Sequence, residues 1–316
     1  MATSASTEDE ECTVAEFIAA RPPRASRSDP RAAAPYAWML FAAAAFAVMG
    51  ACTRAAGEHV DWRLIALARA SLALLFSVAL AAATGVKLIV FAPRSLWIRD
   101  LAGSLSLVCT FYALTKLPVP DTLTLTNMFP LWVVILSWPL LGQPPTVGVV
   151  LAAGVGLAGV VLMQQPHLDG SGTWAGFVAF FASLTSAVAM LGLHRLKHLD
   201  PRAIVAHFSA VAVATMLLTL VAPGAPPIRW GAVETTDVFL LLGVGVAATA
   251  GQLAITRAFA TGQPAKVSVV ALTQVAFGAG FDVAIWNRTF GWATVVGMLL
   301  ILAPTAWVLV RRAQRV

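Results

Sequence analysis

Ten long apolar stretches, separated by short polar connections, make up almost the whole chain after residue 34. A helix that spans a membrane needs about 20 mostly apolar residues, and each stretch approaches that length. They are residues 35–52, 64–84, 97–115, 119–141, 147–163, 174–193, 203–221, 238–255, 267–286 and 292–310. The third is the weakest, because Arg99 and Asp100 stand near its start. The pattern predicts an all-α membrane protein with ten transmembrane helices, and nine spans is the alternative.

The composition excludes a water-soluble protein. Of the 316 residues, 59% are hydrophobic and 11% are charged, and the mean hydropathy is +0.81, whereas soluble domains carry about 25% charged residues. The net charge of +6 does not indicate nucleic-acid binding, since the basic residues lie mostly in the gaps between apolar stretches. Cys12, Cys52 and Cys109 are widely spaced and form no disulfide or metal motif. We therefore expect no cofactor and no metal.

The polar tail and the basic residues predict the orientation. Residues 1–34 lack an apolar segment, so we expect a disordered tail rather than a signal peptide. If that tail is cytoplasmic, 15 of the 21 Lys and Arg residues fall on the cytoplasmic side and 5 on the outer side, with Arg69 inside a span. The positive-inside rule then predicts that both termini are cytoplasmic, and it favours ten spans over nine.

A His-x-Asp-x-Arg pattern occurs twice, at residues 59–63 and at residues 198–202, which are 139 positions apart. Farther along the chain, the spacing of matching residues settles near 145. These matches predict two copies of a five-helix unit, residues 35–165 and 172–312. A unit with an odd number of spans must take opposite orientations in its two copies. Such inverted repeats are common in secondary transporters, where the substrate site lies near the midplane between the halves.

Residues 111–121, which read FYALTKLPVPD, and residues 130–132, which read PLW, resemble motifs of EamA-like transporters in the drug/metabolite transporter superfamily. The resemblance covers about residues 35–312. It implies an alternating-access carrier whose cavity is lined by the third, fourth, eighth and ninth spans and closed by the first and sixth. The chain departs from the family where Gly142-Gln143 and Asn287-Arg288 stand in place of Gly-Glu. No role of that glutamate is therefore carried over.

Six side chains are candidates for binding a solute, because ionisable and polar groups inside a membrane are costly and are often functional. They are Tyr112, Asn127, Gln252, Arg257, Gln274 and Arg69. Arg69 could bind an anionic group, or it could pair within the bundle or reach the outer interface. Asn127 and Gln274 could line the pathway or bond between helices. Tyr112 could stack on the solute or pack against the next span.

Asp282, near the outer end of its span, is the candidate for proton coupling, since a carboxyl group there could take up and release a proton. The alternative is an interfacial carboxylate near Arg288. His207 is interpreted as a packing or hydrogen-bonding residue rather than a proton relay.

The predicted function is a secondary transporter, a permease or exporter, that moves a small organic solute across a bacterial inner membrane. Its expected partners are that solute and the lipid bilayer, without nucleic acid, and pairing with a second copy is left open. The alternative is a membrane-embedded enzyme that acts on a lipid-linked substrate. That enzyme would need a convergent set of acids, bases or metal ligands, and the sequence contains no HExxH or GxSxG motif.

Overall fold

The computed structural model describes residues 30–89, 91, 93–117, 119–165, 173–221, 234–287, 289 and 291–313. Throughout these ranges the chain is helical or forms short connections, without a β-strand. The disordered tail was predicted to cover residues 1–34, and residues 1–29 of it lie outside the described residues. The first described helix already includes residues 30–34.

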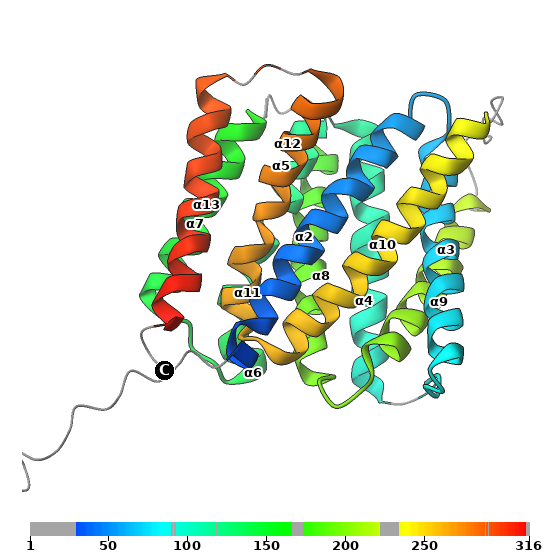
Figure 1. Cartoon of the computed structure of the whole chain (residues 1–316), viewed down its shortest axis with the longest axis horizontal. Helices are drawn as coiled ribbons and strands as arrows, with labels where there is room; N and C mark the ends of the chain where they lie inside the picture. The colour runs from blue at the N-terminus through cyan, green and yellow to red at the C-terminus, as the bar shows by residue number, and fades with distance from the viewer. Residues whose placement is uncertain are drawn as a thin grey trace, which may run out of the picture.

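The helices stand side by side as a bundle, with the C-terminus at its lower end in Figure 1. They are α2 (Pro30–Ala56), α3 (Trp62–Ala83), α4 (Arg94–Lys116), α5 (Val119–Thr126), α6 (Phe129–Leu141), α7 (Val147–Gln164), α8 (Thr173–Arg195), α9 (Pro201–Leu220), α10 (Thr235–Thr261), α11 (Pro264–Ala271), α12 (Thr273–Trp286) and α13 (Trp292–Ala313).

Within the described ranges, nine segments are long and apolar enough to cross a membrane, with α5–α6 and α11–α12 each forming one segment. The segment absent from this set is α4, although its 23 residues run alongside the other helices (Figure 1). Its first turns carry Arg94, Arg99 and Asp100, which reduce its hydropathy. The all-α membrane class is confirmed, and the tenth span stays a prediction.

Two of the spans are each broken into two helices. α5 ends at Thr126 and α6 begins at Phe129, directly before Pro130. Proline has no backbone N–H, so it cannot donate the hydrogen bond that would continue α5. The second break lies at Leu272, between α11 and α12. Both breaks fall in the interior of a span, and the backbone N–H groups of Asn127, Met128 and Leu272 still donate to the carbonyls of Leu123, Leu125 and Val269.

Small residues allow the helices to approach one another closely. At the crossing of α7 and α13, a side-chain carbon on Gly159 would lie 2.6 Å from the carbonyl oxygen of Gly297. A side-chain carbon on Gly251 of α10 would lie 2.8 Å from the Phe46 ring of α2. Small residues at helix crossings are typical of membrane bundles. Large apolar side chains such as Trp138 are exposed on the outside of the bundle, as expected where lipid replaces water.

Candidate functional site

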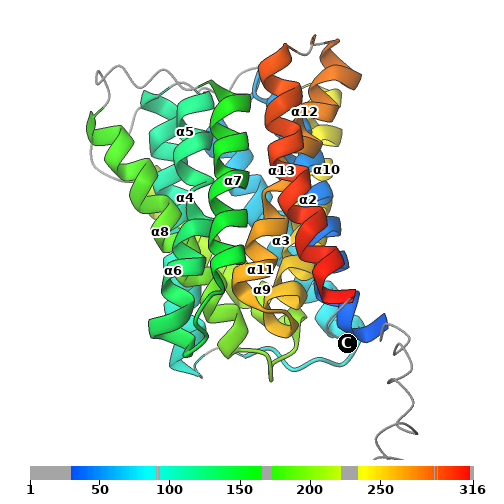
Figure 2. The same cartoon turned by 90° about the vertical axis from the view of Figure 1, so that its left-hand side faces the viewer.

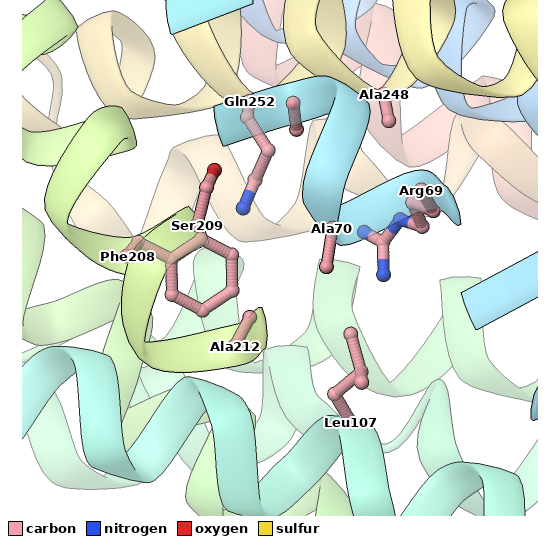
Figure 3. A pocket seen from close by; sticks show the side chains of 9 residues that line it. Arg69, Ala70, Leu107, Phe208, Ser209, Ala212, Ala248 and Gln252 are labelled. Atoms are coloured by element: carbon pink, nitrogen blue, oxygen red, sulfur yellow. The ribbon is translucent and has the colours of Figure 1, made fainter. Parts of the chain in front are cut away.

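A small, partly open cavity of about 20 Å³ lies between α3, α4, α9 and α10 (Figure 3). Its polar lining is formed by Arg69 of α3, Ser209 of α9 and Gln252 of α10. Leu107 of α4 and Phe208 of α9 supply the larger apolar side chains. In Figure 3, Gln252 and Ser209 lie close together on one side of the cavity, and the Arg69 guanidinium lies on the other.

Helical periodicity turns these lining residues toward the same interior. The spacing i, i+1, i+4 occurs in both facing helices: Arg69, Ala70 and Ala73 in α3, and Phe208, Ser209 and Ala212 in α9. Residues with this spacing share one face of a helix. Since three of the six are alanines, the two faces leave space between them.

Arg69 gives this cavity a positive charge. Among the described residues, no carboxylate forms an ion pair with it, and no hydrogen bond to its guanidinium is found. An arginine within a membrane bundle is costly unless an opposite charge, water or a ligand compensates it. The polar atoms of Arg69, Ser209 and Gln252 form only a small part of the cavity surface, which is almost wholly apolar.

A second charged cluster lies behind the cavity wall, where α4 packs on α9. Arg99 donates to Asp100 Oδ1 at 2.6 Å, and His207 Nδ1 lies 2.5 Å from Asp100 Oδ2. Arg99 is 1% exposed, Asp100 is 0% exposed and His207 is 7% exposed. The Arg99 guanidinium lies 4.2 Å from the centroid of the Phe208 ring, which itself lines the cavity.

A third charged contact joins the end of α2 to the end of α12. Arg54 donates to Asp282 at 2.6 Å, and its guanidinium also lies 4.4 Å from the Trp286 ring centroid. The side chains of Arg54 and Asp282 are 49% and 25% exposed. Arg288, the partner considered for Asp282 from the sequence, lies outside the described residues. Proton coupling at Asp282 stays a prediction.

The structure brings two of the six predicted solute-binding residues together, because Arg69 and Gln252 both line the cavity. Four lie outside its lining. Tyr112 of α4 is 37% exposed, and Gln274 lies beside the break between α11 and α12. Asn127 lies in the break between α5 and α6, where its amide donates to the Leu123 carbonyl at 2.7 Å. Arg257 lies 4.8 Å from the Trp38 ring. The roles of these four residues stay predictions.

The helices around the cavity also differ from the expected set. This cavity is lined by α3, α4, α9 and α10. The resemblance implied a solute cavity lined by the third, fourth, eighth and ninth stretches, which are α4, α5–α6, α10 and α11–α12, and that lining stays a prediction. Sequence reasoning missed Ser209 and Phe208. The spacing of 139 could have indicated them, because it matches Phe208 with Arg69 and Ser209 with Ala70. It also treated Arg99, Asp100 and His207 separately, since 107 positions separate Asp100 from His207.

Comparison with known proteins identifies related sequences and a related fold. A model of the EamA-like transporter family matches the chain twice, at residues 34–164 and 173–310. A solved crystal structure matches with a TM-score of 0.73 and 17% identity, covering 84% of this chain and 96% of that one. At this identity the structural likeness concerns the fold alone.

Several curated proteins are similar in sequence. The pseudopaline exporter CntI of Pseudomonas aeruginosa is 29% identical over 263 residues, which is 81% of this chain and 89% of that protein. An uncharacterized transporter of Helicobacter pylori is 23% identical and covers 66% of this chain. Solute carrier family 35 member G1 of Mus musculus is 21% identical, covering 69% of this chain and 62% of that protein.

Proposed function

Since the chain belongs to the EamA-like transporter family, we propose that it moves a small organic solute carrying an anionic group, which binds in the cavity between α3, α4, α9 and α10. The family and the exporter relatives identify a multi-pass membrane transporter rather than an enzyme. The proposal concerns the solute, the site and the mode of transport. The pseudopaline exporters among its relatives support a small organic molecule as the solute.

The observation that carries the proposal is the guanidinium of Arg69, which lines the cavity and forms no ion pair with any described residue. A positive charge inside a membrane protein is retained at a cost in stability, and a functional role is the usual reason. Ser209 and Gln252 add hydrogen-bonding groups opposite it. A carboxylate or similar anion would satisfy all three groups, while the alanines and Leu107 would accept an apolar portion of the solute.

An inverted repeat is supported by three independent features. The family model matches each half of the chain. A span is broken in each half, at α5–α6 and at α11–α12, as in other transporters whose sites lie between repeats. The lining residues of α3 and α9 coincide at the spacing of 139, and Leu107 and Gln252 coincide at 145. Under this symmetry the cavity lies between the halves, where alternating access requires it.

The two halves of the second broken span suggest which end is closed. Most of α11 is buried, and it packs against α2, α6, α7 and α13, whereas α12 contains one buried residue, Thr273. Figure 2 shows α11 in the lower half of the bundle and α12 in the upper half. We assign the lower end to the cytoplasm of a bacterial inner membrane, with both termini inside. The burial of α11 then supports a conformation closed on the cytoplasmic side.

Transport by the purified protein in liposomes tests the proposal. The panel contains acetate, L-aspartate, succinate and citrate as anions, with L-lysine and a cationic dye as counterparts. We expect uptake of at least one anion, with a loss of at least tenfold in Arg69→Gln. Arg94→Gln is the matched control, because Arg94 is exposed at the start of α4. Uptake of cations alone, or equal uptake by Arg69→Gln, would overturn the anionic solute.

A further inference from the structure

Two arginines join the two halves of the chain at opposite ends of the bundle. Arg54, at the end of α2, binds the end of α12, and Arg195, at the end of α8, binds the end of α6. Figure 2 shows α12 in the upper half of the bundle and α6 in the lower half. We propose that these contacts are the gates of the transporter: Arg54 closes the outer end and Arg195 closes the cytoplasmic end. This inference rests on the alternating-access transport and the orientation proposed above.

The outer contact is an ion pair with an aromatic ring beside it. Arg54 donates to Asp282 Oδ1 at 2.6 Å, and its guanidinium lies 4.4 Å from the centroid of the Trp286 ring. α2 belongs to the half of the chain that the first family match covers, and α12 belongs to the half covered by the second. The contact therefore holds the two halves to each other. The side chains of Arg54 and Asp282 are 49% and 25% exposed, so water is available to replace the contact when it opens.

The inner contact uses a backbone acceptor in place of a carboxylate. Arg195 donates to the carbonyl oxygen of Leu140, the last residue but one of α6. The adjacent His194 lies 3.2 Å from the side-chain nitrogen of Gln143, and its Nδ1 lies 3.0 Å from the carbonyl oxygen of Phe259 in α10. α6 belongs to the first half and α8 to the second. This contact therefore also joins one half of the chain to the other, at an exposed position.

The two contacts occupy equivalent positions of the repeat. Arg195 follows Arg54 by 141 positions, at the end of the first helix of the second half. The helices that they bind end in the same way, at Gly142 and Asn287, which are 145 positions apart and have φ angles of 66° and 49°. In both, the backbone N–H donates to the carbonyls five and four positions earlier. Equivalent positions in an inverted repeat lie at opposite faces of the membrane, as a pair of alternating gates requires.

The end of a helix attracts an arginine, which is the physical reason for both contacts. The last carbonyls of a helix lack an intrahelical donor and carry partial negative charge. Arg195 binds such a carbonyl directly, and Arg54 binds a carboxylate one turn before the end of α12. α6 and α12 are the second parts of the two broken spans. The breaks would serve as hinges at which each helix end moves away from its arginine.

A gate contact has to open at little cost, and the exposure of these contacts meets that need. An exposed ion pair shifts an equilibrium by only a few fold, since solvent compensates the separated charges. Arg99 and Asp100 also join at 2.6 Å, but their side chains are 1% and 0% exposed. Separation of that pair would leave two buried charges without compensation. Arg54 with Asp282 is therefore the pair suited to opening and closing, whereas Arg99 with Asp100 is suited to staying joined.

Access to the cavity from each side tests the gates without any solute. A single cysteine would replace Leu107, which lines the cavity, in a chain lacking Cys12, Cys52 and Cys109. An impermeant thiol reagent reaches it from the outer side in intact cells and from the cytoplasmic side in inside-out vesicles. The cavity of about 20 Å³ does not admit such a reagent, so the labelling rate reports opening.

Each gate should control labelling from its own side alone, because loss of a contact favours the state that lacks it. We expect Arg54→Gln to raise the labelling rate in intact cells by roughly two- to fivefold and to leave the rate in vesicles without a rise. Arg195→Gln should raise the rate in vesicles and not in cells. General loosening of the bundle would instead raise both rates.

Conservative variants separate gating from damage to the fold. Arg54→Lys and Arg195→Lys retain a cation that can donate to the same acceptors, so both should label close to the wild-type rates. Exchange of the outer charges, Arg54→Asp with Asp282→Arg, should return the rate in cells to that of the wild type. Arg94→Gln is the matched control, since Arg94 is an exposed arginine at the start of α4 and should change neither rate.

A glutamine variant that labels faster from both sides, or from neither, would overturn its gate. An outer charge exchange that keeps the raised rate would overturn the ion pair as the closing contact. Asp282→Asn and His194→Ala carry the same expectations as the two glutamine variants and decide where an arginine variant does not fold. Anion transport with unchanged labelling retains the proposed function and loses this inference. Side-specific labelling in a protein that moves no anion does the reverse.

Discussion

Two ion pairs of this protein have similar chemistry but opposite surroundings. Arg54 and Asp282 meet at 2.6 Å with side chains that are 49% and 25% exposed. Arg99 and Asp100 also meet at 2.6 Å, but their side chains are 1% and 0% exposed. Exposed charges lose little when separated, since solvent compensates each of them. Buried charges depend on one another, because removal of either leaves the other without compensation. Burial, and not distance, therefore determines how much each pair matters.

The predicted inverted repeat requires that His59 and His198 lie at opposite faces of the membrane, and an all-or-none labelling experiment tests this. Single cysteines would replace His59 and His198 in a chain lacking Cys12, Cys52 and Cys109. Under the inverted repeat, an impermeant thiol reagent added to intact cells should label position 59 and not position 198. Permeabilised cells are the control, in which both should react because both histidines are exposed. Labelling of both positions in intact cells would contradict the inverted topology.

Asp100→Asn should have the largest effect on stability, because it leaves Arg99 as an unpaired buried cation. We expect a loss of about 3–5 kcal/mol, measured as a lower melting temperature in detergent. Joint replacement of Arg99, Asp100 and His207 by leucine should recover much of the loss, since no buried charge then remains. Asp100→Asn with wild-type stability would show that Arg99 does not depend on Asp100.

A matched pair of glycines sharpens the same contrast. A side-chain carbon on Gly192 would lie 2.8 Å from Arg99 Cβ, while one on Gly50 of α2 meets nothing within 4 Å. Gly192→Ala should therefore cost about 1–3 kcal/mol through overpacking. Gly50→Ala should leave the melting temperature unchanged or slightly higher, since alanine favours helix. Equal effects of the two substitutions would contradict tight packing around the buried cluster.

Arg54→Gln and Asp282→Asn should have the smallest effects, each below about 1 kcal/mol, and the effects should shrink at high salt. Exchange of the two charges, Arg54→Asp with Asp282→Arg, should restore the stability that either substitution loses. If Asp282→Asn abolished the pH dependence of transport, Asp282 would be the coupling residue, as the sequence alone suggested.

The sequence predicted most of the fold because spans are defined by a local property. Hydrophobic length alone located α2, α7 and α13 within a few residues, and Pro130 indicated the position of a break. Arg69 was identified for the same reason, since a charged residue inside an apolar stretch can be recognised from the sequence alone. α4 was the weakest predicted span because Arg99 and Asp100 lower its hydropathy. The sequence does not show that His207 lies beside Asp100 in the folded bundle.

The chain by itself therefore determined the membrane class, the family and the two residues of the cavity, Arg69 and Gln252, that are unusual for their position in a span. Only the tertiary structure decided which helix faces meet. It placed Phe208 and Ser209 opposite Arg69, and it joined Asp100 to His207 across 107 positions. It also paired Asp282 with Arg54 at a partly exposed end of the bundle. The physical reason is that apolar length is read residue by residue, whereas the compensation of a charge depends on the groups that packing brings within a few ångströms.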